Sequence, residues 1–378
     1  MTTDKHNKRP NVPPLRFPEF TEPWETAKLG AIAEFSKGTG ISKEQRSETG
    51  LPCILYGELY TTYTNEVIED VVSKTDLDPT DLVKSQKNDV VIPSSGETAE
   101  DIATARCVTS DNVLLGGDLN IIRLVEPNDG RFMSYQLNGI RKYDIAKIAQ
   151  GVSVVHLYGG DLKMLSVTFP QSPEQKKIAD CISLLDRRIS VQSGLINKLE
   201  SLIGGIIERL TAQYPNVRIA DCLECHSSTL QENQLNETGG YRVYGANGIC
   251  GYTDSPGING DAILIVKDGS GVGNVSYAIG EYSVIGTSNY LTAKNGYSLR
   301  YLYYILKKFN FAPYKTGMAI PHIYFKDYGR AMVYCPSFEE QERIAKKLSK
   351  IERKIEIERS IKDCCIAQKQ YLLQQMFI

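Results

Sequence analysis

Residues 150–185 read QGVSVVHLYGGDLKMLSVTFPQSPEQKKIADCISLL, and residues 316–351 read TGMAIPHIYFKDYGRAMVYCPSFEEQERIAKKLSKI. The two stretches align without a gap, which places Gly151 on Gly317 and His156 on His322. Upstream the correspondence is weaker and the spacing between the copies grows. A repeat of about half the chain is too long for a solenoid. It indicates two copies of a globular unit, each followed by a helix.

Both predicted helices begin at a serine N-cap. Ser172 is followed by a proline at the first helical position and then by Gln175, which is expected to reach back to the cap in a capping box. Residues 337–340 (SFEE) are interpreted in the same way, with Ser337 as the N-cap, shifted by one residue relative to the gap-free alignment. Two helices of about 35–40 residues are predicted, each about 50–60 Å long.

Behind the caps, Ile and Leu recur at alternating spacings of four and three, which is the pattern of a coiled-coil seam. The second seam falters at Glu358 and Lys362. Since long helices draw most of their stability from packing, the two seams are expected to pair with each other, antiparallel. The predicted helix-pairing residues are Ile178, Ile182, Leu185, Ile189, Ile196, Leu199, Ile203, Ile344, Leu348, Ile351, Ile355 and Leu372.

Each globular unit has the pattern of short strands, many turns and one helix. Strands are predicted at 52–56, 90–93, 114–124 and 165–169 in the first and at 241–244, 262–266, 275–279 and 289–293 in the second, with helices at 132–147 and 299–308. The predicted fold class is two α/β (α+β) domains in tandem duplication, separated by two long α-helices that form an antiparallel coiled coil. The predicted segments are a lead-in (residues 1–23), head one (24–168), a first spacer helix (169–212), head two (213–335) and a second spacer helix (336–378).

The charge balance excludes a uniformly basic nucleic-acid coat, because 43 Lys and Arg face 45 Asp and Glu. Head one has a net charge of −7 (14 cations against 21 anions) and head two of +1 (10 against 9), so any DNA contact depends on local cations. No apolar stretch approaches the roughly 20 residues of a membrane span, and the polar start does not resemble a signal peptide. Nine scattered cysteines suit reduced thiols, which predicts a cytoplasmic location.

No catalytic or metal-binding constellation is predicted. Residues 222–226 spell CLECH, a haem-attachment string, but no second ligand pair for zinc lies nearby in sequence. The glycine-rich loop at 267–273 lacks a following helix and is interpreted as a hairpin loop. His156 and His322 recur without a nucleophile beside them, which leaves a structural hydrogen bond or a ligand contact as their role.

Several segments together resemble one known family. Residues 170–179 (PQSPEQKKIA) and 336–345 (PSFEEQERIA) are similar to the two helix starts of type I restriction–modification specificity subunits. Residues 12–20 (VPPLRFPEF) resemble the N-terminal lead-in of that family, and residues 372–377 (LLQQMF) its C-terminal end. The resemblance covers essentially the whole chain.

The resemblance implies a non-catalytic, DNA-reading subunit. Each head would be a target recognition domain for one half of a bipartite, asymmetric site in double-stranded DNA, and the helices would set the unread spacer. The helices would also dock two modification (methyltransferase) subunits, joined by restriction (translocase and nuclease) subunits. No cofactor is expected on this chain itself, since S-adenosylmethionine, ATP and Mg2+ belong to the partner subunits, and no membrane partner is expected.

Base reading is expected from loop side chains that reach the major groove, with phosphate contacts adding salt-dependent affinity. The alternative is a coiled-coil scaffold whose two heads bind proteins or glycans, which the acidic first head favours. The DNA-binding candidates, chosen by loop position and repeat equivalence, are Lys37, Thr39, Tyr56, Tyr60, Ser94, Ser95, Ser153 and His156 in head one, and Ser227, Ser228, Tyr244, Asn247, Lys267, Ser270, Lys315 and His322 in head two.

Overall fold

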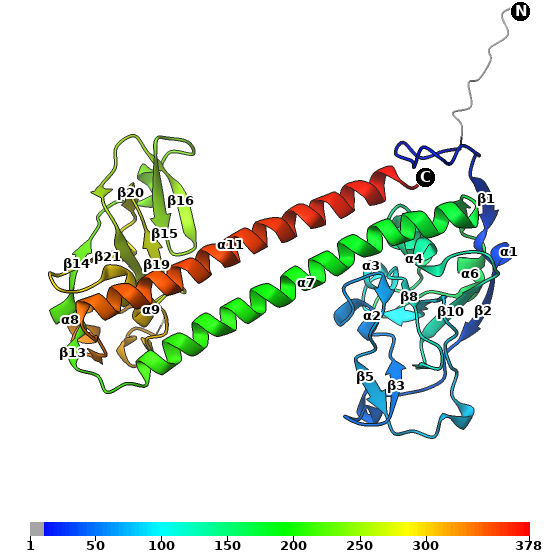
Figure 1. Cartoon of the computed structure of the whole chain (residues 1–378), viewed down its shortest axis with the longest axis horizontal. Coiled ribbons are helices and arrows are strands. Elements are labelled where there is room, and N and C mark those ends of the chain that lie inside the picture. The colour runs from blue at the N-terminus through cyan, green and yellow to red at the C-terminus, as the bar shows by residue number, and fades with distance from the viewer. Residues whose placement is uncertain (1–10, 319) are drawn as a thin grey trace, which may run out of the picture. The chain divides into compact units, whose positions relative to one another are not determined.

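The computed structural model describes residues 11–318 and 320–378. The chain folds into two compact units: the first extends to Gln192 and includes Ile361–Ile378, and the second is Ser193–Ser360. Two long helices, α7 (Ser172–Thr211) and α11 (Phe338–Gln375), are each divided between the units, so that one segment of each helix belongs to each unit (Figure 1). None of the helices in the described part of the chain combines the length and apolarity that crossing a membrane requires.

Head one is built on a five-stranded sheet in the order β2-β10-β6-β8-β4, in which only the β4–β8 pair is parallel. A three-stranded sheet, β5-β3-β9, and the pairs β1–β12 and β7–β11 complete its strands. The strands are β1 (Glu25–Lys28), β2 (Ala33–Lys37), β3 (Leu51–Ile54), β4 (Val67–Ile68), β5 (Ser73–Thr75), β6 (Asp89–Pro93), β7 (Ser95–Gly96), β8 (Arg106–Val108), β9 (Leu114–Leu115), β10 (Leu119–Leu124), β11 (Val155–His156) and β12 (Ser166–Phe169). The helices are α1 (Leu29–Ile32), α2 (Glu58–Thr61), α3 (Ala99–Ile102), α4 (Gly130–Asn138), α5 (Lys142–Ile148) and α6 (Gly159–Lys163).

Two predicted elements of head one are each divided in the structure. The strand predicted at 114–124 is two strands in different sheets, because a turn with Asp118 at φ 57° separates β9 from β10. The helix predicted at 132–147 is two helices, α4 and α5, because the chain leaves helical geometry at Gly139. The expected strands near residues 52, 90 and 166 are present as β3, β6 and β12.

Head two has two four-stranded sheets, β14-β21-β18-β19 and β16-β15-β20-β17, and the pair β13–β22. The strands are β13 (Val217–Arg218), β14 (Leu223–Ser227), β15 (Tyr241–Gly245), β16 (Gly248–Thr253), β17 (Ile258–Asn259), β18 (Ala262–Val266), β19 (Val275–Ala278), β20 (Glu281–Val284), β21 (Ser288–Ala293) and β22 (Met332–Val333). The helices are α8 (Ile219–Cys222), α9 (Leu299–Lys307) and α10 (Phe325–Tyr328). The predicted fold class is confirmed: two mixed α/β heads in tandem with two long helices. The five-segment division of the chain stays a prediction.

The core of the first unit closes around three aromatic rings from distant parts of the chain. Trp24, before β1, packs edge-on against Phe132 of α4 at 5.7 Å between ring centroids. Phe377, just after α11, lies 5.0 Å from Phe132 and 6.5 Å from Trp24. All three are at most 3% exposed. The residue just before β1 and the residues just after α11 are therefore part of this core.

The helix starts differ from the predicted capping box. Gln175 does not reach back to Ser172: its amide donates to the carbonyl oxygen of Pro170 at 2.8 Å, and its carbonyl accepts from the backbone N–H of Asp129 at 2.9 Å. The neighbouring Glu174 accepts from two Arg16 nitrogens at 2.7 Å. These side chains are occupied by tertiary contacts, which outcompete the local cap. At the second helix, the Ser337 hydroxyl does accept from the Glu340 N–H, at 3.4 Å.

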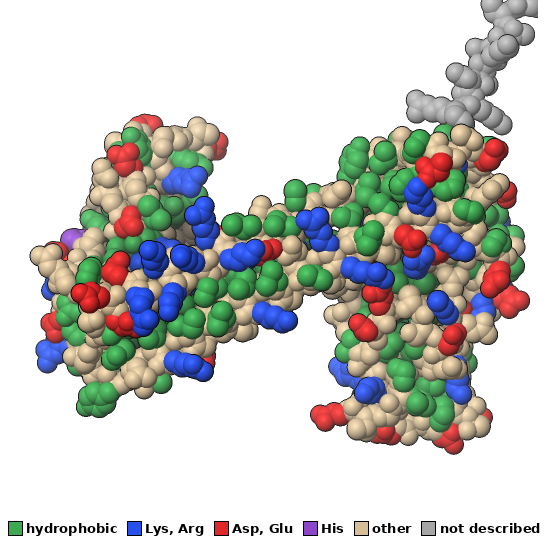
Figure 2. All heavy atoms as spheres, viewed as in Figure 1, with side chains coloured by type: hydrophobic (Ala, Val, Ile, Leu, Met, Phe, Trp, Pro, Cys, Tyr) green, Lys and Arg blue, Asp and Glu red, His purple; other side chains and the backbone are tan. Residues whose placement is uncertain are grey.

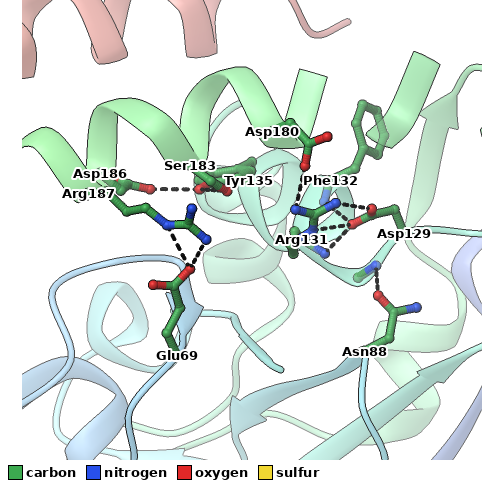
Figure 3. Close-up of polar contacts among 11 residues, drawn as sticks. Glu69, Asn88, Asp129, Arg131, Phe132, Tyr135, Asp180, Ser183, Asp186 and Arg187 are labelled. Carbon is green, nitrogen blue, oxygen red and sulfur yellow. Dashed lines mark hydrogen bonds and ion pairs between the residues drawn. The ribbon is translucent and has the colours of Figure 1, made fainter. Parts of the chain in front are cut away.

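The N-terminal part of α7 contacts α4 through polar side chains (Figure 3). The Tyr135 hydroxyl donates to Asp186 at 2.7 Å and lies 3.1 Å from the Ser183 hydroxyl. Arg131 donates to Asp180, also at 2.7 Å. Burial raises the pKa of the Asp186 carboxyl group. The Lys369 ammonium, 2.6 Å away, opposes this shift because it stabilises the charged carboxylate.

The second unit repeats this contact between α9 and α11. The Tyr304 hydroxyl donates to Glu352 at 2.6 Å and lies 3.1 Å from the Ser349 hydroxyl. In the gap-free alignment of the two helices, Ser349 falls on Ser183 and Glu352 on Asp186. The duplication therefore extends to the way in which each head holds its helix.

Ten of the twelve predicted helix-pairing residues, all except Leu185 and Ile189, lie in or against the main apolar cluster of their unit, and the pairing itself stays a prediction. In each unit, segments of the two helices share one apolar cluster. Glu358, where the seam falters, is buried and forms an ion pair with Lys354. Among the pairing candidates, Ile178, Ile182, Ile196, Ile203, Leu348 and Ile355 are buried, and Leu185, Ile189, Leu199, Ile344, Ile351 and Leu372 are half-buried. Lys and Arg side chains gather on the surface of the second unit (Figure 2). Lys346, Lys347 and Lys350 of α11 are exposed.

Candidate nucleic-acid interface

The head-one candidates gather at one end of the five-stranded sheet. There β2 ends at Lys37 and β6 ends at Pro93, both beside the first residues of β10. The loop after β2 is held by Thr39, whose hydroxyl accepts from the Val83 N–H at 2.9 Å. The loop after β6 carries Ser94, whose N–H donates to the Asp118 carbonyl at 2.7 Å. Three loops therefore meet at this end.

A short hairpin covers the same end. Backbone hydrogen bonds of 2.9 and 2.7 Å join Gln150 and His156, and Gly151 turns the chain at φ 121°. His156 pairs with Ser95 across β11 and β7. Ser153 lies exposed in the loop of this hairpin.

Two tyrosines complete the set in head one. Tyr56 lines a cavity of about 870 Å3 together with Gly117 and Asp118, the loop that precedes β10. The Tyr60 hydroxyl lies 3.9 Å from the position that a Cβ would take at Gly96, beside the hairpin. Burial raises the pKa of Tyr60, so the phenol stays protonated and can donate. Lys37, Ser153 and His156 are exposed, whereas Ser94 and Ser95 are buried.

Head two brings its candidates to the corresponding sheet end. Ser227, the last residue of β14, donates to the Asn289 side chain at 2.9 Å. At the end of β18, the Lys267 N–H donates to the Thr287 carbonyl at 2.9 Å, and the Lys267 carbonyl accepts from Ile323 at 2.9 Å. Lys267 thereby joins the sheet end to the second hairpin.

That hairpin has the construction seen in head one. Backbone hydrogen bonds of 2.9 and 2.8 Å join Thr316 and His322, and Gly317 turns the chain at φ 87°. Lys315, next to it, is exposed. The loop at 267–273 contacts the hairpin through a hydrogen bond of 2.9 Å from Gly269 to Pro321.

The remaining head-two candidates border the same region. A Cβ at Gly271 would lie 3.5 Å from Ala246, in the turn that also carries Asn247. Tyr244 lies in β15 just before this turn, and its carbonyl accepts from Ile285 at 3.0 Å. The Ser228 hydroxyl caps the loop after β14 by accepting from Leu230, whereas Ser270 and Asn247 are exposed.

The glycine-rich loop is a hairpin loop between β18 and β19, as predicted, because Gly273 bonds back to Val266 at 2.9 Å. The CLECH string is part of α8 and β14. Burial raises the pKa of Cys225 to about 11, and His226 stacks on Tyr290 at 4.8 Å between centroids. In the described ranges, no group of three or more His, Cys, Asp or Glu side chains is positioned to hold a metal ion.

One element beside the candidates was missed by the sequence reading. Each head carries a 3₁₀ turn after its first sheet strand, Lys43–Gln45 in head one and Glu232–Gln234 in head two. Each turn ends in a glutamine at the third position after its cap, the spacing of a capping box. That spacing could have revealed both turns.

Comparison with known proteins identifies the family. A model of the family described as "Type I restriction modification DNA specificity domain" matches residues 21–201 and again residues 213–364. A candidate type I specificity subunit of Mycoplasma genitalium is 26% identical over 204 residues, which are 44% of this chain and 53% of that protein. The match thus spans about half of that relative's own length.

Solved structures share the fold. The crystal structure of a type I restriction–modification S subunit from M. genitalium superposes with a TM-score of 0.74 at 20% identity, covering 97% of this chain and 99% of that one. A chain from a study of complex assembly and conformational transition in the type I system superposes with a TM-score of 0.50 at 16% identity, covering 94% and 97%. With two copies of the family's domain along most of its length, this chain belongs to the type I restriction–modification DNA specificity family.

Proposed function

We propose that this chain is the DNA sequence-specificity subunit of a type I restriction–modification complex. Each head reads one half of a bipartite, asymmetric site in double-stranded DNA. The observation that carries this proposal is the gathering of the candidate residues at one sheet end in each head, on loops of the same construction. Two similar frames that present different side chains suit two different half-sites.

The candidate residues have the chemistry that DNA contact requires. Lys37, Lys267 and Lys315 supply ammonium groups for phosphates, whose neutralisation gives affinity that falls with salt. Tyrosine, serine and asparagine side chains, such as Asn247, can hydrogen-bond to base edges. The hairpins with His156 and His322 are alike in both heads, so their role is in positioning on the duplex rather than in sequence reading.

The long helices fix the distance between the two half-sites and dock the partner subunits. In this proposal they bind two modification subunits, which methylate adenine with S-adenosylmethionine. Restriction subunits with ATP and Mg2+ join that core. The chain itself recognises DNA and carries out no chemistry, and it binds no cofactor.

The test is co-expression with the modification subunit encoded beside the gene, followed by long-read mapping of adenine methylation across the host genome. The expected result is one two-part motif with a fixed gap. A stable complex that adds no methylation would contradict the proposal.

The second candidate function is a scaffold whose heads bind proteins. It is favoured by exposed apolar side chains at equivalent hairpin positions, Val152 and Val154 in head one and Met318 and Ile320 in head two. Salt separates the two functions, because neutralisation of several phosphates makes DNA affinity fall steeply between about 50 and 200 mM salt. Apolar protein contacts lack that dependence.

A further inference from the structure

In each head, a 3₁₀ turn follows the first strand of the main sheet, which is β2 in head one and β14 in head two, and the two turns are built in the same way. In Lys43–Gln45, the side chain of the last residue accepts a hydrogen bond from the Ser42 N–H at 2.8 Å. In Glu232–Gln234, the side chain of the last residue accepts from the Gln231 N–H at 2.9 Å. Both turns are closed capping boxes, in which the cap side chain also accepts from the turn.

The backbone after each turn is anchored alike. Ser47 forms a bridge with Lys74 in head one, and Asn236 forms one with Tyr252 in head two; Ser47 and Asn236 each donate the backbone N–H at 2.9 Å. The turns and the bridges align without a gap, so that Ser42 falls on Gln231 and Ser47 on Asn236. Main-chain contacts and one glutamine therefore hold both turns in place, whatever their other side chains are.

Those other side chains differ in chemistry. Lys43 corresponds to Glu232, which reverses the charge, and Glu44 corresponds to Asn233. All four are exposed. Within the described residues, the side chains of Lys43, Glu232 and Asn233 form no hydrogen bond or ion pair. The hairpins with His156 and His322 show the opposite behaviour, since there the residue types themselves recur.

The first residue of each turn lines a recess of its head. In head one, Lys43 lines the cavity of about 870 Å3 together with Tyr56 and Asp118. In head two, Glu232 lines a groove of about 590 Å3 against β16, the strand that follows the turn carrying Asn247. In head one, Lys43 therefore shares a cavity with the candidate Tyr56, and in head two the groove of Glu232 is walled by the strand that begins directly after the candidate Asn247.

We propose that these 3₁₀ turns are specificity-determining elements, in which Lys43 and Glu44 contact base edges of one half-site and Glu232 and Asn233 contact those of the other. The inference rests on the proposed function. Lysine suits the O6 and N7 acceptors of guanine, glutamate the N4 donor of cytosine, and asparagine the N6 and N7 edge of adenine. Because the backbone of the turn is the same while the side chains at its first two positions vary, the two heads can differ in sequence preference without any change of fold.

The test transfers the chemistry of one turn to the other. The double variant Lys43→Glu/Glu44→Asn gives the turn of head one the two side-chain types that head two carries at these positions. The full complex with the modification subunit is then assayed by genome-wide mapping of adenine methylation. The expected result is a changed or relaxed base at one or two positions in one half of the motif, with a loss of about 10- to 100-fold in discrimination there. The other half and the gap stay as in the wild type.

A charge-matched control is Lys87→Gln, which also lowers the net charge by one, at an exposed position before β6 at the opposite end of the sheet. It should leave the motif unchanged. A double variant that methylates the wild-type motif at the wild-type level would overturn the inference. If the double variant methylates nothing, the purified complex is used to select from duplexes randomised in both half-sites, and an unaltered sequence preference would overturn it. Absence of any motif with the wild-type chain would instead contradict the proposed function.

Discussion

The side chain of Gln175 accepts a hydrogen bond from the backbone N–H of Asp129, at 2.9 Å, and so joins the start of α7 to the N-cap of α4. In the second unit, Gln341 accepts from the N–H of Ser298, the N-cap of α9, at 3.0 Å. Each glutamine also donates, at 2.8 Å, to the carbonyl of the proline that precedes its helix. One residue type thus fixes head to helix twice.

Removal of either glutamine side chain should destabilise only its own unit. Gln175→Ala leaves a buried N–H and a carbonyl unpaired, which costs about 1–3 kcal/mol. Hydrogen exchange should show faster exchange in α4 for Gln175→Ala and in α9 for Gln341→Ala. Gln374→Ala, at an exposed position of α11, serves as the control and should change neither. Equal effects on both helices from one substitution would contradict this account.

The end of the chain should be essential to the first unit. Phe377→Ala removes a ring that packs on Trp24 and Phe132, with an expected cost of about 3–5 kcal/mol in unfolding free energy. Denaturant unfolding followed by Trp24 fluorescence reports this directly, since Trp24 is the only tryptophan. Tyr371→Ala, which removes an exposed aromatic ring near the end of α11, should cost under about 0.5 kcal/mol. Equal costs for the two variants would contradict the proposed packing.

The hydroxyl groups of Tyr135 and Tyr304, which donate to the long helices, should contribute similar amounts to the stability of their units. Tyr135→Phe leaves the buried Asp186 with one partner fewer, and Tyr304→Phe does the same for Glu352. Each is expected to cost about 1–3 kcal/mol, measured by denaturant unfolding. Tyr143→Phe, whose ring is mostly exposed, provides the matched control and should be close to neutral. Neutral behaviour of Tyr135→Phe would show that Lys369 alone satisfies Asp186.

A lysine at the candidate interface should contribute affinity without sequence preference. Lys267→Ala removes one phosphate contact, so the slope of log affinity against log salt should fall by about one unit for every DNA sequence alike. Arg218→Ala, at an exposed position of β13, should leave the slope unchanged. Titration of the complex with labelled duplexes at several salt concentrations measures both. An unchanged slope for Lys267→Ala would remove this residue from the interface.

The long elements were predictable because their signals are periodic or repeated. The gap-free repeat located both helix starts, and most residues of the predicted seam lie in the two main apolar clusters. The strand β16 was missed, since the exposed, glycine-containing sequence Gly248–Thr253 lacks the alternation of apolar and polar residues that marks a strand. The predicted role of Gln175 in a capping box was wrong, because its side chain bonds instead to Asp129, a tertiary partner that the local sequence does not reveal.

The candidate site was predictable in outline but not in detail. Loops between strands were the expected place for binding residues, but their meeting at one sheet end depends on the strand order, which was not predicted. The burial of Ser94 and Ser95 depends on the packing of the hairpin at 150–156, which the sequence does not reveal. The two 3₁₀ turns were missed because their exposed residues differ most between the heads, so the repeat comparison passed over them.

The central claim is that each head reads its own half-site, and a head exchange tests it most directly. Residues 213–335 are replaced by the corresponding domain of another specificity subunit, and adenine methylation is mapped with the same modification subunit. The account predicts that one half of the two-part motif changes while the other half and the gap persist. A motif that changes in both halves, or in neither, would contradict it.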